Sequence, residues 1–196
     1  MTILLTGDSI TDAGRDRDDL TSWGDGYASL IGQALADQTV INTGISGNRV
    51  VDLQGRWDAD VLAHTPAVLS IMIGINDTWR RFDRDDPTST EAYDAGYRDI
   101  VSRAQAAGVK RIILVEPFLL PVTDDQWAWR EDLDPKIQAV RRIALDLGTD
   151  YVATDGPLTQ RAAAVGPAAL AYDGVHPTPD GHRFLADLWL DAYRSG

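Results

Sequence analysis

Residues 67–73 read Ala-Val-Leu-Ser-Ile-Met-Ile, an apolar run of strand length that only Ser70 interrupts. A strand that is apolar on both faces is typical of a parallel sheet with helices on either side. Similar runs precede and follow it along the chain. They lie at residues 2–6, 39–43, 111–116 and 151–154. The sequence therefore predicts a mainly parallel sheet in which the strand at 67–73 is buried.

Amphipathic stretches lie between these runs, and three of them have apolar residues at helical spacing. Their apolar positions are Tyr93, Tyr97, Ile100, Val101 and Ala104; Ile137, Val140, Ala144 and Leu147; and Phe184, Leu185, Leu188, Trp189 and Ala192. Thr178-Pro179 precedes the last stretch and is typical of an N-cap followed by proline in the first helical position. Alternating strands and helices predict a three-layer α/β fold with right-handed crossovers, in one domain spanning residues 1–196.

Two connections differ from the rest. The polar stretch 80–90 is predicted to be an exposed loop. The longer connection 117–134 is rich in acidic and aromatic residues, including Trp127 and Trp129. Its aromatic side chains must either fold back over the core or be buried in a neighbouring chain, as in a homo-oligomer.

The composition narrows the possible partners. The formal net charge is −12, with 30 acidic residues against 18 Lys and Arg, so nucleic acid is not an expected partner. No apolar run is long enough to cross a bilayer, and the N-terminus enters a strand pattern at once without a secretory signal. The chain has no cysteine, which excludes disulfides and thiolate chemistry. A cytoplasmic protein is expected.

Three short polar segments follow predicted strands. They are Gly7-Asp8-Ser9-Ile10, Gly44-Ile45-Ser46-Gly47-Asn48 and Gly74-Ile75-Asn76-Asp77. Sites of open α/β sheets form beyond the carboxyl ends of the strands, so these segments are candidates for one site. Each alone is equally compatible with a turn or a helix cap. Asp8 and Asp77 are predicted to satisfy turn amides.

A fourth segment, Asp173-Gly174-Val175-His176-Pro177, comes just before the last helix. An Asp three residues before a His can accept from Nδ1–H, which fixes the tautomer and leaves Nε2 free as a base. The alternatives are a plain capping loop and a metal site made from His176, Asp180 and His182. No further His or Cys is available except the distant His64, so no metal is expected. His182 is predicted to lie on the surface of the last helix.

Together the four segments resemble the GDSL/SGNH hydrolase family, whose sequence blocks carry Ser, Gly, Asn and His in this order. The resemblance implies a flavodoxin-like five-stranded parallel sheet in the order 2-1-3-4-5. It also implies acyl-ester hydrolysis through an acyl-enzyme, without cofactor or metal. Ser9 would be the nucleophile, His176 the base and Asp173 the residue that orients it. The oxyanion hole would consist of the backbone N–H groups of Ser9 and Gly47 and the side-chain amide of Asn76.

Residues 7–15, 44–48, 71–80 and 171–177 most resemble the intracellular acetylxylan esterases of this family. The resemblance implies an acetylated xylo-oligosaccharide as substrate and an oligomeric enzyme. The sequence departs at Tyr172, where those enzymes tend to carry Trp, and in residues 118–129. Flat apolar surfaces for sugar rings are predicted at Trp79, Tyr172 and Phe118, with Trp127 a further candidate. Trp57 is predicted to pack in the core instead.

Two other functions stay open at this point. The first is a short-chain lipase or thioesterase of the same family, against which the absence of an evident amphipathic lid counts slightly. The second is a non-catalytic, flavodoxin-like module that binds phosphate on residues 7–11. That segment has neither a glycine-rich phosphate pattern nor a lysine, and this function leaves Asp173 and His176 unexplained.

Overall fold

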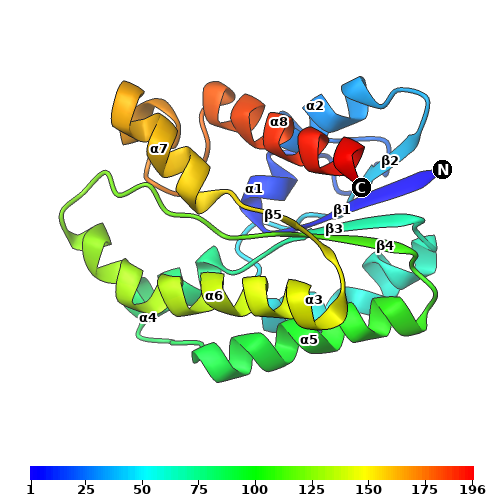
Figure 1. The fold of residues 1–196 in the computed structure, drawn as a ribbon, viewed down its shortest axis with the longest axis horizontal. Coiled ribbons are helices and arrows are strands. Elements are labelled where there is room, and N and C mark those ends of the chain that lie inside the picture. Colours follow the sequence, from blue (N-terminus) through cyan, green and yellow to red (C-terminus); the bar gives the residue numbers. More distant parts are fainter.

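The sheet of the computed structural model, which covers residues 1–196, has five parallel strands in the order β2-β1-β3-β4-β5 (Figure 1). The strands are β1 (Thr2–Gly7), β2 (Thr39–Asn42), β3 (Val68–Met72), β4 (Arg111–Val115) and β5 (Asp150–Val152). Each lies where the sequence predicts a strand, with small differences at the ends. The strand order that the family resemblance implied is confirmed.

Helices cover both faces of the sheet and give the predicted three layers (Figure 1). One face carries α1 (Ser9–Asp12), α2 (Tyr27–Ala34), α7 (Asp155–Val165) and α8 (Pro179–Ser195). The other carries α3 (Val50–Asp60), α4 (Ile75–Arg84), α5 (Thr90–Ala106) and α6 (Arg130–Leu147). Three short 3₁₀ helices complete the structure: η1 (Leu62–His64), η2 (Asp125–Trp129) and η3 (Pro167–Ala169). None of the helices combines the length and apolar content that spanning a bilayer would need.

The core consists of two apolar clusters, one on each side of the sheet. Successive residues of β1 point to opposite faces, so Ile3 and Leu5 join one cluster while Leu4 joins the other. Every residue of β3 is buried, including Ser70, as the apolar run at 67–73 predicts. Trp57 lies on α3 and is fully buried, which confirms its predicted place in the core.

The strand order has one switch point, at β1, where successive strands are added first on one side of β1 and then on the other. β1 pairs with β2 on one side and with β3 on the other, and Gly7 lies opposite Met72. The segments that follow these two strands, which contain Ser9 and Asn76, therefore start side by side. Such switch points are where open α/β sheets form their sites.

The N-terminus of α8 has the predicted cap, because the Thr178 hydroxyl accepts from the Gly181 amide and Pro179 occupies the first helical position. His182 does not simply lie on the surface of this helix, as the sequence suggested. It is half-buried, and its Nδ1 accepts from the Tyr27 N–H at the start of α2, 3.1 Å away. Burial and the nearby His176 lower the pKa of His182 to about 4.

His182 should make the protein less stable in mild acid. The unfolded imidazole has a pKa of about 6.5 and therefore binds a proton at a pH where the folded imidazole, with its pKa of about 4, does not. The contribution of His182 to the free energy of unfolding is complete above pH 6.5. We expect it to fall by about 2–3 kcal/mol as the pH decreases toward 4. Urea unfolding of wild type and His182→Gln at several pH values would measure this, and parallel pH dependences would contradict it.

The stretch 80–90 is largely exposed, as its polarity predicted, but only residues 85–89 of it form a loop. Helix α4 continues through Arg84, and α5 begins at Thr90. Polar contacts to another helix replace the missing apolar periodicity, because Arg81 pairs with Glu131 and Asp132 on α6. Phe82 also stacks on Trp129, with ring centroids 5.4 Å apart.

The connection 117–134 is more structured than predicted, because it contains η2 and the first turn of α6. Most of its apolar side chains fold back into the core of this chain. Phe118, Leu119, Leu120 and Trp129 are all buried. Only Trp127 among its large aromatic residues stays exposed, with 64% of its surface accessible.

Candidate active site

Ser9 is presented by a tight turn at the end of β1. Gly7 leaves no room for a side chain, since a Cβ there would lie 2.1 Å from the Met72 carbonyl oxygen. The Asp8 carboxylate accepts from the Ile10 amide at 3.0 Å and caps the single turn of α1. This confirms the predicted structural role of Asp8. Burial raises the pKa of Asp8 to about 7, although the Ile10 amide and the charge of His176 oppose the shift.

Ser9, His176 and Asp173 form one chain of hydrogen bonds. The Ser9 Oγ lies 3.0 Å from His176 Nε2, and His176 Nδ1 lies 2.7 Å from Asp173 Oδ2. The other oxygen of Asp173 accepts from the amides of Val175 and His176. Burial raises the pKa of Asp173, but these hydrogen bonds outweigh burial and hold the pKa below its ordinary value. A charged Asp173 keeps the proton of a neutral His176 on Nδ1, so that Nε2 can accept from Ser9.

The loop that carries Asp173 is clamped by the connection that follows β4. Gln126, which is buried, donates from Nε2 to the Asp173 carbonyl oxygen at 2.6 Å and accepts at Oε1 from the Val122 amide. The Leu120 amide donates to the carbonyl oxygen of Gly174 at 2.9 Å. Sequence reasoning missed Gln126, because a single glutamine inside a long connection carries no recognisable pattern.

Gly174 should tolerate no side chain. Its φ is +86°, and a Cβ would lie 2.8 Å from both Gln126 Oε1 and the Leu120 carbonyl oxygen. We expect Gly174→Ala to lower the free energy of unfolding by about 1–3 kcal/mol, because it adds backbone strain and breaks the clamp. Displacement of Asp173 should also lower kcat.

Gly55→Ala is the matched control for Gly174→Ala in urea unfolding. Gly55 lies inside α3, and a Cβ there would meet nothing within 4 Å. It should raise the free energy of unfolding by up to about 1 kcal/mol. Equal stability of the two variants would contradict the role of the hydrogen bonds from Gln126 and Leu120 to the loop that carries Asp173.

The second and third segments meet the first through hydrogen bonds. The Ile45 amide donates to the Gly7 carbonyl oxygen at 3.1 Å, and Asn76 Nδ2 donates to the Asn48 carbonyl oxygen at 3.1 Å. One N–H of the Asn76 side chain is thus still available. Gly47 has a φ of +83°, and its N–H makes no hydrogen bond within the chain.

Two neighbours of Asn76 hold this region in place. The guanidinium of Arg80 donates to Asn76 Oδ1 at 3.2 Å, which leaves the amide nitrogen as the outward donor. Asp77 accepts from the Val50 amide at 3.1 Å, at the start of α3. This confirms that Asp77 satisfies a backbone amide. Burial raises the pKa of Asp77 to about 7.

The aromatic residues that were predicted to bind sugar rings have different surroundings in the structure. The ring of Trp79 lies 5.8 Å from that of His176, and Tyr172 has 65% of its surface exposed beside Asp173. Phe118 is 1% exposed and packs in the core, so it cannot offer a face to a sugar ring. The prediction of a binding surface at Phe118 is wrong for this reason. Trp127 lines a separate cavity of about 480 Å³ between the connection and α7.

Comparison with known proteins identifies the family. The model of the GDSL-like lipase/acylhydrolase family matches residues 5–184. An acetylxylan esterase from Geobacillus stearothermophilus is 38% identical over 202 residues, which cover 96% of this chain and 91% of that protein.

Two solved structures are similarly close. The crystal structure of Axe2, an acetylxylan esterase from Geobacillus stearothermophilus, has a TM-score of 0.89 and 36% identity over 97% of this chain and 93% of its own. LAE5, an α/β hydrolase from the metagenome of Lake Arreo in Spain, also has a TM-score of 0.89. It is 34% identical over 97% of this chain and 94% of its own.

The fold and the sequence blocks together place the protein among the carboxylic ester hydrolases. The chain belongs to the GDSL-like lipase/acylhydrolase family.

Proposed function

We propose that this protein is a serine esterase that removes acetyl groups from xylo-oligosaccharides, with the whole chain acting as one catalytic domain. The observation that carries the proposal is the relay from Ser9 Oγ through His176 to Asp173, with hydrogen bonds of 3.0 and 2.7 Å. A serine, a base and an orienting carboxylate in this geometry are the elements of nucleophilic acyl transfer.

The reaction proceeds in two halves. Ser9 Oγ attacks the ester carbonyl while His176 Nε2 takes its proton, and His176 then gives this proton to the departing sugar oxygen, which leaves as a hydroxyl. Water attacks the acetyl-Ser9 ester with His176 again as base, which releases acetate and restores the Ser9 hydroxyl. The N–H groups of Ser9 and Gly47 and the Asn76 amide stabilise the oxyanion in both halves. Each such donor contributes about 3–4 kcal/mol to the transition state.

The substrate follows from the relatives and from the rim of the site. Both the 38%-identical protein and Axe2 are acetylxylan esterases, and the four sequence blocks are intact in this chain. Trp79 lies against His176, and Tyr172 is exposed beside Asp173, so each offers a flat face for a sugar ring. Tyr172 replaces the Trp expected there, and its hydroxyl adds a polar end to that face.

The substrate is tested by acetate release from acetylated xylo-oligosaccharides, and the acyl preference by p-nitrophenyl esters from acetate to decanoate. We expect rapid acetate release and a maximum at acetate among the esters. A maximum at octanoate or beyond would indicate a lipase or thioesterase instead. Labelling by a serine-directed organophosphate provides the test against a binding module, since intact mass should show one adduct, located on Ser9.

A homo-oligomer and a cytoplasmic location stay predictions. Trp127 is the remaining exposed aromatic of the connection, so it is the residue to probe for an interface. Trp129 is unsuitable as a probe because it is 6% exposed and packs in the core. Light scattering of wild type and Trp127→Glu would decide between a mass of 21.4 kDa and a multiple of it.

A further inference from the structure

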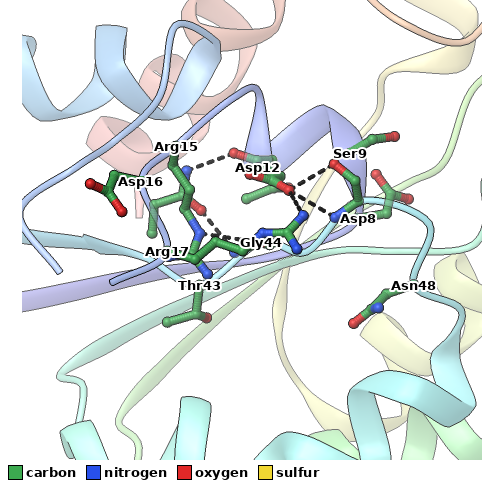
Figure 2. Close-up of polar contacts among 12 residues, drawn as sticks. Asp8, Ser9, Asp12, Arg15, Asp16, Arg17, Thr43, Gly44 and Asn48 are labelled. Carbon is green, nitrogen blue, oxygen red and sulfur yellow. Dashed lines mark hydrogen bonds and ion pairs between the residues drawn. The ribbon is translucent and has the colours of Figure 1, made fainter. Parts of the chain in front are cut away.

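The loop that carries Gly47 is held by residues that directly follow the nucleophile segment. Figure 2 shows Asp12, Arg15 and Arg17 gathered against Thr43 and Gly44. Asp12 Oδ2 accepts from both the amide and the hydroxyl of Ser46, at 2.9 and 2.7 Å. Arg15 Nε donates to the Gly44 carbonyl oxygen at 2.9 Å. Asp12 is 2% exposed, whereas Ser46 lies at the surface, so the carboxylate reaches this loop from the buried side.

Arg56 on α3 contacts both ends of the same loop. Arg56 donates to the Thr43 carbonyl oxygen at 2.7 Å, and its Nε donates to the side chain of Asn48 at 2.7 Å. The Asn48 amide donates to the Ile45 carbonyl oxygen at 3.2 Å, which closes a turn over residues 45–48. Gly47 is the third residue of this turn and has a φ of +83°.

A positive φ at the third position is typical of a type II turn. The alternative type I turn differs by inversion of the central peptide, here the one that joins Ser46 to Gly47. That inversion would reverse the direction of the Gly47 N–H, the group that is left without a partner in this loop. The state of one peptide therefore decides whether Gly47 can serve as an oxyanion donor.

We propose that Asp12 is a positioning residue for catalysis, which acts through Ser46 to fix the direction of the Gly47 amide in the oxyanion hole. This inference rests on the proposed esterase function. Asp12 holds both the backbone and the side chain of Ser46, so the residue before the decisive peptide cannot rotate freely. Gly47 itself has no side chain with which to fix the peptide.

The charge of Asp12 matters to this role. Burial raises the pKa of Asp12, but hydrogen bonds from Ser46 and Arg17 outweigh burial and hold the pKa below its ordinary value. Arg17 also pairs with Oδ2 and offsets the cost of a buried carboxylate. A neutral residue of the same shape would accept more weakly from Ser46.

The inference is tested first by steady-state kinetics with p-nitrophenyl acetate. We expect Asp12→Ala to lower kcat about 10- to 100-fold with little change in KM, somewhat less than complete loss of an oxyanion donor costs. Ser46→Ala retains the hydrogen bond from the Ser46 amide to Asp12, so it should lower kcat by a smaller factor. The double variant Asp12→Ala/Ser46→Ala should have a kcat only slightly below that of Asp12→Ala alone, because the two residues act as a unit. Asp12→Asn serves in place of Asp12→Ala if the alanine variant does not fold.

Glu116→Gln is the matched control for Asp12→Asn. Glu116 is likewise a buried carboxylate that accepts from two groups of one loop, the amides of Thr154 and Asp155, and pairs with an arginine, Arg141. It directly follows β4, and the hydrogen bonds of its side chain go to Arg141, Tyr151, Thr154 and Asp155 and to none of residues 43–48. Its substitution should lower stability without the same loss of kcat. Equal losses of kcat in the two variants would overturn the proposal.

A direct measurement follows the Gly47 amide itself. In ¹⁵N-glycine-labelled protein phosphorylated on Ser9 by diethyl p-nitrophenyl phosphate, the wild-type Gly47 amide proton should move downfield as it donates to the phosphoryl oxygen. The movement should shrink in Asp12→Ala and persist in Glu116→Gln. An unchanged movement in Asp12→Ala would overturn the inference. Failure of the proposed function would look different, because wild type itself would neither hydrolyse the ester nor accept the label.

Discussion

Ser9→Ala is expected to abolish ester hydrolysis while leaving the fold intact. Loss of the nucleophile should lower kcat for p-nitrophenyl acetate by about 10⁴-fold or more, since the acyl-enzyme can no longer form. The Ser9 side chain makes one hydrogen bond, to His176 Nε2 at 3.0 Å, so its removal leaves no buried group of the core unpaired. Circular dichroism and the urea midpoint should match those of wild type.

Ser102→Ala provides the control for this measurement. Ser102 lies exposed on α5, on the opposite face of the sheet from α1, and its substitution should leave kcat unchanged. A Ser9→Ala variant that kept more than about a hundredth of wild-type kcat would show that another group is the nucleophile. Binding of a product or inert analogue by the variant would show separately that the site is still formed.

The sequence predicts the scaffold of this site well because the scaffold depends on local patterns. A buried strand such as 67–73 shows its character in its own residues, and so do turns that need glycine at Gly7 or Gly47. An Asp three residues before a His can be recognised in the same way. These features also come with a family resemblance, which supplies the strand order and brings the four segments together.

The supporting contacts could not be predicted, because they join residues that are distant in sequence and follow no period. Asp12 reaches Ser46 and Gln126 reaches Asp173, each across a different loop. The C-terminal end of helix α4 was predicted as loop for a related reason, since Arg81 pairs with acids on α6 and does not belong to an apolar stripe. The error at Phe118 is of the opposite kind, because an aromatic residue that was assigned to the substrate surface packs in the core.

Asp173→Asn should be nearly as damaging as the loss of Ser9, and the structure gives the reason. Asp173 Oδ1 accepts from the amides of Val175 and His176, so the asparagine oxygen must take that place. Its NH₂ group then faces His176 Nδ1, where the carboxylate had accepted at 2.7 Å. Nδ1 must now accept, and the imidazole proton moves to Nε2. In that tautomer His176 cannot take the proton of Ser9.

We expect kcat of Asp173→Asn to fall by about 10⁴-fold, as the equivalent substitution does in serine proteases, with the loop unchanged. Asp180→Asn is the control, since Asp180 is an exposed acid in the first turn of α8 that pairs with Arg183. The tautomer can be observed directly by ¹⁵N NMR, because the chain has only three histidines. Wild-type His176 should carry its proton on Nδ1 and the variant on Nε2. A variant that kept the Nδ1–H tautomer, or more than about a tenth of kcat, would show that Asp173 does not orient the base.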